Sequence, residues 1–215
     1  MVTIQCDLSN QVEMEKTLSL IKRKYGERIA VIINNAGMRM KYQNFQHLDQ
    51  NECMRVFQLN TFNAVRFMQS LVPEENSNDR QCYIVNVAST LGTLTPAKVA
   101  GYGASKSALI AFHQSYSMEL QTRRVSNIRT LLVVPGQLNT AMFSGFEAPR
   151  QFFAPVVEIG TLADQIVQKC EMGERGELNV PFYSNFAHLL MGMPYMVQIW
   201  ARKFAQIDNC LPDEE

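Results

Sequence analysis

The sequence IAVIINNAG, at residues 29–37, joins an unbroken apolar run to a polar turn that ends in glycine. Unbroken apolar runs are typical of strands that are buried on both faces of a parallel sheet. Similar runs follow at 82–88 (CYIVNVA) and 128–134 (IRTLLVV), with a shorter one, ELNV, at 177–180. A first short run, MVTIQCD, is also expected to form a strand, which ends at Asp7. These runs predict the strands of one parallel sheet.

Helical patterns separate the predicted strands. Asn10 and Glu13 have the spacing of a capped helix start, and this helix is expected to run to Tyr25 and to stop at Gly26. Three further helices are expected, at residues 49–71, 102–122 and 161–173. Strands that alternate with helices predict the α/β class, with a doubly wound parallel sheet.

The composition limits the classes of molecule that the protein is expected to bind. Apolar residues make up 47% of the 215 residues and charged residues 19%, which is the composition of a globular domain. Lys and Arg together number 20, as do Asp and Glu, so no net charge favours nucleic acid or an acidic membrane as partner. The five cysteines are odd in number and form no CxxC pair, which indicates reduced thiols and a cytoplasmic location. The N-terminal residues turn polar too early for a signal peptide.

The segment GYGASKSAL, residues 101–109, places a tyrosine and a lysine one helical turn apart. Tyr102 and Lys106 would therefore lie on one face of the helix, with small neighbours that let other groups approach. A lysine ammonium beside a phenol is expected to lower the phenol pKa from its ordinary value of about 10. Taken alone, such a pair is more often a half-buried aromatic side chain and a solvated lysine than a catalytic pair.

Six motifs in order give the pair its context: CDLS, NNAG, FQLN, VNVAST, YxxxK and PGQLNT. Together they resemble the short-chain dehydrogenase/reductase family over nearly the whole chain. Ser89 and Tyr102 are 13 positions apart, which matches the spacing of the family's catalytic Ser and Tyr. The resemblance implies a tetrad of Asn60, Ser89, Tyr102 and Lys106. In it, Tyr102 exchanges a proton, Ser89 holds the substrate oxygen, Lys106 acts on Tyr102 and the nicotinamide ribose, and Asn60 anchors a proton relay.

The resemblance also implies NAD or NADP as cofactor. Asp7 would bond the adenine amino group, although a turn or helix-cap role is the alternative for this residue. Leu138 and Thr140 would contact the carboxamide and the phosphate. Asn86 is interpreted as part of a structural network at the strand ends, and His113 as packing or surface rather than a base. The cofactor-binding residues implied are Asp7, Asn34, Ala36, Gly37, Tyr102, Lys106, Pro135, Gly136, Leu138 and Thr140. No metal site is expected, because the histidines lack acidic or cysteine partners at metal-ligand spacing.

One family motif is not found in these 215 residues. Members of the family begin with a strand and a Gly-rich turn, TGxxxGxG, that binds the cofactor pyrophosphate. The sequence is therefore expected to form a single, N-terminally incomplete Rossmann-like domain over residues 1–215, without the first strands and that turn. Two interpretations remain open. The chain is part or an isoform of a working enzyme, or it is a short protein that keeps a binding or assembly role without catalysis.

The C-terminal region indicates the substrate class. PGQLNT and the sequence after it resemble the branch of the family that contains retinol and 17-beta-hydroxysteroid dehydrogenases, which implies a hydrophobic alcohol or ketone of retinoid, steroid or lipid type. The apolar segment 182–215 is expected either to pack in the core or to form a wall or lid over such a substrate, and to touch a lipid surface. The resemblance also implies a homodimer, formed by the helices at 49–71 and 102–122. The cytoplasmic location would then include the surface of the endoplasmic reticulum or of lipid droplets.

Overall fold

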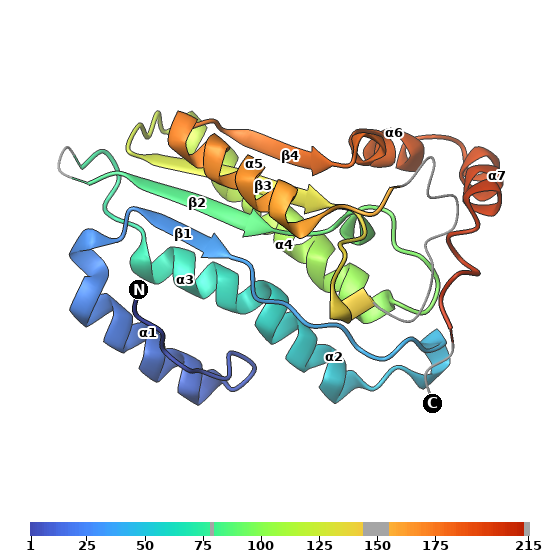
Figure 1. The fold of residues 1–215 in the computed structure, drawn as a ribbon, viewed down its shortest axis with the longest axis horizontal. Helices are drawn as coiled ribbons and strands as arrows, with labels where there is room; N and C mark the ends of the chain where they lie inside the picture. Colours follow the sequence, from blue (N-terminus) through green and yellow to red (C-terminus); the bar gives the residue numbers. More distant parts are fainter. Residues whose placement is uncertain (78–79, 144–154, 213–215) are drawn as a thin grey trace.

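The computed structural model of the chain describes residues 1–77, 80–143 and 155–212. In this part of the chain one sheet of parallel strands runs in the order β1-β2-β3-β4 (Figure 1). The strands are β1 (Val31–Asn34), β2 (Cys82–Val87), β3 (Ile128–Pro135) and β4 (Gly176–Val180). The helices are α1 (Gln11–Tyr25), α2 (Gln50–Phe57), α3 (Asn63–Leu71), α4 (Ala100–Thr122), α5 (Ile159–Met172), α6 (Ala187–Met191) and α7 (Tyr195–Ala205).

Helices cover the sheet from both sides, which confirms the α/β class. Alternate strand residues point to opposite faces. Ile32 and Ile84 pack with α1, α3 and α4 on one face, whereas Val85 and Leu131 pack with α5 on the other. Strand β2 is buried along its whole length because it has helices above and below it.

Strand β1 corrects the prediction of burial on both faces. Ile32 is 7% exposed, but its neighbours Val31 and Ile33 are 46% and 51% exposed. These two residues pair with Tyr83 and Val85, so they lie on the face that α5 covers. Figure 1 shows α5 over β3 and β4, beyond the reach of β1 at the edge of the sheet. The apolar run therefore correctly predicted a strand, but it did not show whether a helix packs on the second face of that strand.

The strand predicted to end at Asp7 is wrong, because residues 1–7 join no strand in the described chain. In the strand order that the resemblance implies, two strands that this sequence does not contain would separate this segment from β1, so it has no backbone ladder to join. The segment instead leads into α1. The Asn10 side chain caps this helix by accepting from the amides of Val12 and Glu13, as the sequence predicted. Asn63 on α3 donates to the Leu8 carbonyl and ties the segment to the body.

The single helix predicted at 49–71 is interrupted. Asp49 caps the start of the helix, because its carboxylate accepts from the Asn51 and Glu52 amides. Asp is one of the residue types preferred at this position. The π-helical turn Gln58–Phe62 then separates α2 from α3. Such a turn inserts one extra residue and shifts the faces of the helix, and π turns are frequent at functional sites.

The C-terminal segment packs at one end of the sheet. Helices α6 and α7 lie beyond the carboxyl end of β4 (Figure 1). No residue of α7 is buried, so the packing of this helix in the core, one of two predicted alternatives, is not observed. Within the described ranges, no helix is long and apolar enough to cross a bilayer.

Candidate active site

Helix α4 carries Tyr102 and Lys106 on the face that packs against the sheet. Both side chains are buried, at 6% and 4% exposure, so the reading of Lys106 as a solvated surface charge does not hold. The Lys106 ammonium donates to the carbonyl of Val87, the last residue of β2, at 2.8 Å. The Tyr102 hydroxyl lies close enough to Ser89, which follows Val87 by two residues, for the Ser89 side chain to act on its pKa. The structure thus brings three of the four predicted tetrad residues together at the carboxyl end of β2.

Glycines let α4 approach the turn that follows β2 this closely. A Cβ atom on Gly103 would lie 2.4 Å from a Thr95 side-chain carbon and 2.9 Å from the Leu91 carbonyl oxygen. A Cβ on Gly92, within the turn, would lie 2.8 Å from the Lys106 backbone. The small residues around Tyr102 are therefore explained by a close backbone approach, which sets the distance between α4 and Ser89.

We expect Gly103→Ala to lower the free energy of unfolding by about 1–3 kcal/mol, because the new methyl group must displace the Thr95 side chain and the Leu91 carbonyl. Gly160→Ala is the matched control, since it is also helical and its Cβ would meet nothing within 4 Å. That change should raise stability by about 0.5–1 kcal/mol. Urea unfolding of both variants measures the difference, and equal effects would contradict the close approach.

Asn60 is the fourth tetrad residue, and the π-helical turn points it inward. Its side chain is 1% exposed and makes a two-way contact with Met38, accepting from the Met38 amide at 2.8 Å and donating to the Met38 carbonyl at 2.9 Å. The Asn60 amide also donates to the Ser105 hydroxyl at 2.9 Å, and Ser105 donates to the Tyr102 carbonyl at 2.7 Å. Asn60 therefore links the chain after NNAG to the helix that carries Tyr102.

Gly37 lies between two members of the tetrad. A Cβ on Gly37 would be 3.5 Å from both the Asn60 side-chain oxygen and the Lys106 ammonium. The NNAG turn thus reaches the catalytic helix directly, and Ala36 beside it is exposed. The predicted cofactor-binding turn and the predicted tetrad form one continuous site.

A polar network holds the ends of β1 and β2 together. Asn34 donates to the Asn86 side-chain oxygen at 2.7 Å, and the Asn86 amide donates to His113 Nδ1 at 3.0 Å. His113 is 4% exposed on α4. The interpretation of Asn86 and His113 as structural is consistent with these contacts. Asn34 lies in the same network, so any contact it makes with a cofactor would be additional to this role.

Burial lowers the pKa of His113 to about 4, while Glu177 acts weakly in the opposite direction. Since the unfolded pKa is about 6.5, His113 stabilises the fold fully above pH 6.5, and this contribution falls between pH 6.5 and pH 4. We expect the wild-type protein to lose about 2 kcal/mol more between pH 7 and pH 5 than His113→Gln does. Urea unfolding at the two pH values tests this, with exposed His47→Gln as the control. Equal pH dependence in the wild type and His113→Gln would contradict it.

The electrostatics of Tyr102 correct one prediction. Its pKa is raised to about 12 rather than lowered, because burial outweighs the opposing effect of the nearby Ser89 side chain. Burial also lowers the pKa of Lys106 to about 8, so this side chain stays mostly cationic at neutral pH. The i, i+4 spacing correctly placed the pair on one face, but it could not show how completely both side chains leave water. At neutral pH Tyr102 is a phenol that can donate a proton.

The end of β3 forms the other side of the site. Pro135 ends the strand as predicted, and the Gly136 amide donates to the Val180 carbonyl at 2.6 Å. A Cβ on Gly136 would lie 2.7 Å from the Tyr183 hydroxyl, whose pKa the nearby Thr90 side chain acts to lower. Tyr183 was not identified from the sequence, where it appeared only as part of an apolar segment. Leu138 bridges to Val157, and the Thr140 amide turns back onto the Leu138 carbonyl.

Asp7 lies apart from the tetrad at the start of α1. It is exposed, and its carboxylate accepts from the amide and hydroxyl of Ser9, which together lower its pKa. This is the turn role that the sequence gave as an alternative, and the adenine contact stays a prediction. Among the residues that the structure describes, no three His, Cys, Asp or Glu side chains gather as a metal site.

The buried cation and the small turn around it fit the nicotinamide half of a dinucleotide. The Lys106 ammonium, Gly37 and Pro135–Gly136 all lie at the carboxyl ends of parallel strands, where doubly wound folds bind nucleotides. A glycine at this point leaves space beside the ammonium. The fold and the site together define the nucleotide-binding class of parallel α/β proteins.

Comparisons with known proteins give the family. A family model described as short chain dehydrogenase matches residues 1–151. The chain is 59% identical over 209 residues to the uncharacterized oxidoreductase TDA5 of Saccharomyces cerevisiae, a match that covers 97% of this chain and 64% of that relative. It is 29% identical over 146 residues to human retinol dehydrogenase 10, covering 66% of this chain and 41% of the relative. The chain therefore belongs to the short-chain dehydrogenase family, and it spans less than two thirds of the length of these relatives.

Solved structures share the fold. A 3-ketoacyl-(acyl-carrier-protein) reductase from Brucella melitensis, complexed with NADH, aligns with a TM-score of 0.68 and 22% identity, over 82% of this chain and 75% of that one. A short chain dehydrogenase from Burkholderia cenocepacia, in complex with NADP, aligns with a TM-score of 0.71 and 21% identity, over 94% of this chain and 80% of that one. Both confirm the Rossmann-like arrangement that the sequence predicted.

Proposed function

We propose that this chain is the catalytic part of an oxidoreductase that transfers a hydride between NAD or NADP and a hydrophobic alcohol or ketone. The observation that carries the proposal is the buried set of contacts in which Lys106, Asn60 and Gly37 meet beside Tyr102. Burying a lysine costs free energy, so a buried lysine indicates that its charge serves a function. The family, the oxidoreductase relatives and the two neighbours with bound NADH or NADP support the same reaction class.

Three side chains of the tetrad then have distinct steps. The bound nicotinamide supplies or accepts the hydride at the substrate carbon. Ser89 holds the substrate oxygen by a hydrogen bond, and Tyr102 gives this oxygen its proton as the carbonyl becomes an alcohol. A phenol with a pKa of about 12 is in the acid form for this step at neutral pH. In the reverse direction the Lys106 cation stabilises the phenolate that takes the proton.

The remaining predicted residues would hold the cofactor. Lys106 and Gly37 border the ribose, and Pro135 with Gly136 borders the nicotinamide. Leu138 and Thr140 would reach the carboxamide and the phosphate beyond β3. Asp7 would meet the adenine, and Ala36 with Asn34 the adenosine ribose. These assignments are proposals that rest on the positions of the residues at the strand ends and on the family resemblance.

The segment 182–215 would form the wall of the substrate site. Tyr183 supports this role, since its hydroxyl lies against Gly136 and close to Thr90, next to Ser89. An apolar wall here suits a retinoid, steroid or lipid-like substrate.

A homodimer through α2–α3 and α4 is also proposed, with a place in the cytoplasm at the surface of the endoplasmic reticulum or of lipid droplets. Met54, Phe62, Phe112 and Met118 leave apolar surface exposed on these helices. Leu109 does not contribute to that surface, because the monomer buries it to 1% exposure.

A hydride-transfer assay tests the function. The chain, extended at its N-terminus by a βαβ unit that carries TGxxxGxG, is mixed with NADH or NADPH and retinal, a 17-ketosteroid, a long-chain ketone or acetone. Loss of absorbance with a hydrophobic ketone, and much less with acetone, is expected. A folded protein that binds the cofactor but consumes none of it with any ketone would refute the catalytic role and favour a binding or assembly role.

A further inference from the structure

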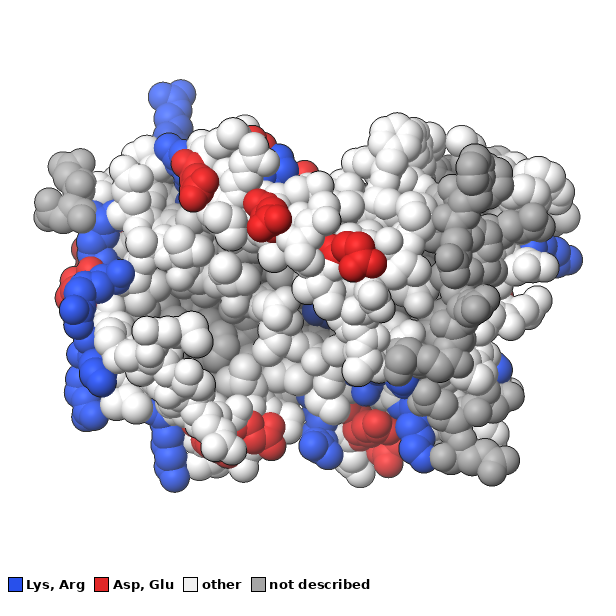
Figure 2. All heavy atoms as spheres, in the orientation of Figure 1, with Lys and Arg blue, Asp and Glu red and all other residues white. Residues whose placement is uncertain are grey.

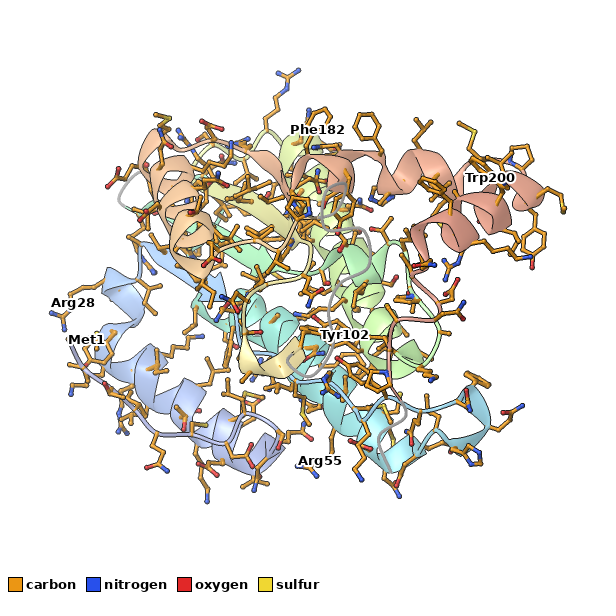
Figure 3. The ribbon with its side chains drawn as sticks, turned by 45° about the vertical axis from the view of Figure 1, so that its right-hand side comes forward. Met1, Arg28, Arg55, Tyr102, Phe182 and Trp200 are labelled. Carbon is orange, nitrogen blue, oxygen red and sulfur yellow. The ribbon has the colours of Figure 1, made fainter. Side chains whose placement is uncertain are left out.

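The segment that follows β4 exposes an unusual number of large apolar side chains. We call this surface the C-terminal apolar face, and its residues are between 40% and 78% exposed. They are Phe182, Phe186, Leu189, Met191, Met193, Tyr195, Met196, Val197, Trp200 and Phe204. Phe182 and Phe186 contact edge to face, and Trp200 stacks on Phe204 one helical turn away. Figure 3 shows Phe182 and Trp200 on the same outer side of the molecule.

The opposite side of this segment is fixed to the body of the protein. Arg202 donates to the Thr95 carbonyl at 2.8 Å and forms an ion pair with Asp208 at 2.5 Å. His188 contacts the Thr93 hydroxyl, and Ser184 is 2% exposed. The apolar side chains therefore face solvent on a segment whose polar contacts point inward.

Charge distinguishes the face from the rest of the surface. No Asp or Glu occurs between Glu177 and Asp208, although the whole chain has 20 of them. The two charged residues in this interval are both basic, Arg202 and Lys203. In Figure 2 the visible described surface over α6 and α7 carries no acidic side chain, and basic atoms lie at its outer edge. Arg202 is paired with Asp208, which leaves Lys203 as the exposed cation beside the apolar surface. Such a surface is complementary to an apolar layer with anionic head groups.

We propose that the C-terminal apolar face docks on an anionic lipid membrane surface, with α7 lying in the interface. Tyr195 and Trp200 have the amphipathic rings that favour the boundary between head groups and acyl chains. The exposed Lys203 stands beside them to meet anionic head groups. The helix lies on the membrane rather than across it, in keeping with its 11 residues. Docking uses none of the catalytic side chains, so it does not require the proposed oxidoreductase activity.

A second copy of the chain is a less suitable occupant. In a two-fold interface the same patch meets itself, so Lys203 would enter the interface with its own copy. Residues 178–207 offer no carboxylate to either lysine. Like charges without a partner oppose such an interface, whereas anionic lipid supplies the missing charge.

The single tryptophan of the chain makes the proposal directly testable, because Trp200 lies within the face. Titration of the 215-residue protein with phosphatidylglycerol/phosphatidylcholine vesicles should shift its emission to the blue. Lipids brominated near the head group should quench it. Partitioning should be about fivefold weaker on pure phosphatidylcholine, since the one exposed cation, Lys203, contributes about 1 kcal/mol on an anionic surface.

Met196→Glu should weaken vesicle binding by about tenfold or more, because it removes an apolar side chain that would insert into the membrane and adds repulsion from the anionic lipid. Val167→Glu, at an exposed position of α5 outside the face and outside the proposed dimer surface, is the control and should bind as the wild type does. Both positions are exposed, so unfolding curves should be unchanged. Trp200 emission that does not change when vesicles are added would overturn the proposal. Equal binding of Met196→Glu and the wild type would overturn it as well. A blue shift that grows with protein concentration in the absence of lipid would assign the face to a second copy instead.

Discussion

Replacing Tyr102 by phenylalanine is expected to lower turnover by a factor of about 100 to 10,000, with cofactor affinity nearly unchanged. Phenylalanine keeps the shape of the ring, which is 6% exposed and packs edge to face against Phe143. Only the hydroxyl beside Ser89 is lost. The effect should therefore appear in kcat and not in the fold or in cofactor binding.

Tyr116→Phe is the matched control, because Tyr116 lies on the same helix and loses the same hydroxyl. Its ring packs against the core formed by α1, α3 and α4, away from Ser89. Steady-state rates and cofactor titrations of both variants, in the form of the protein that shows turnover, measure the difference. Wild-type turnover in Tyr102→Phe would remove Tyr102 from the reaction.

The elements that the sequence predicted best are those with local signals at their ends. Asn10 carries a side-chain oxygen that caps α1, and this contact depends only on neighbours along the chain. Gly173, at φ 64°, ends α5 in the left-handed region that favours glycine. The strand that ends at Pro135–Gly136 was predicted for the same reason. Local chemistry therefore fixed where these elements begin and end.

The wrong predictions concern features that depend on contacts with residues far along the chain. Val31 and Ile33 look as apolar as the residues of β2, but α5 does not reach them. The segment ending at Asp7 has the composition of a strand without a ladder to join. No motif marks the π-helical turn that begins at Gln58, which only the packing of Asn60 against Met38 makes evident.

The predictions for the candidate site also divide into those that rest on local patterns and those that depend on long-range contacts. The i, i+4 spacing predicted that Tyr102 and Lys106 share a face, and the family resemblance added Ser89, which the structure places beside them. Ser105, which connects Asn60 to the Tyr102 carbonyl, was missed because a serine in a helix carries no distinguishing pattern. The pKa of Tyr102 was predicted in the wrong direction, since the depth of burial depends on the whole fold.

The 215-residue chain on its own is expected to bind NADH and NADPH with a Kd in the millimolar range or weaker. A pyrophosphate carries two charges that turn amides and a helix dipole ordinarily stabilise, and the TGxxxGxG turn that supplies them is not in this sequence. Each lost hydrogen bond to a charged group costs about 1.5–3 kcal/mol, so two or three cost about 3–9 kcal/mol. Since 1.4 kcal/mol is about tenfold, a micromolar site becomes millimolar or weaker.

The stability of the isolated chain should be limited by the edge of the sheet at β1. Strand β1 is at the edge, with Val31 and Ile33 exposed beside its unpaired backbone groups, which is a template for aggregation. Addition of a βαβ unit that carries TGxxxGxG should cover this edge, restore micromolar affinity and increase solubility together. Calorimetric titration of the two forms with NADH and NADPH, at matched concentrations of monodisperse protein, measures the gain. A Kd below about 10 μM for the unextended chain, near −7 kcal/mol, would mean that residues such as Lys106 and Thr140 hold the cofactor without a pyrophosphate turn.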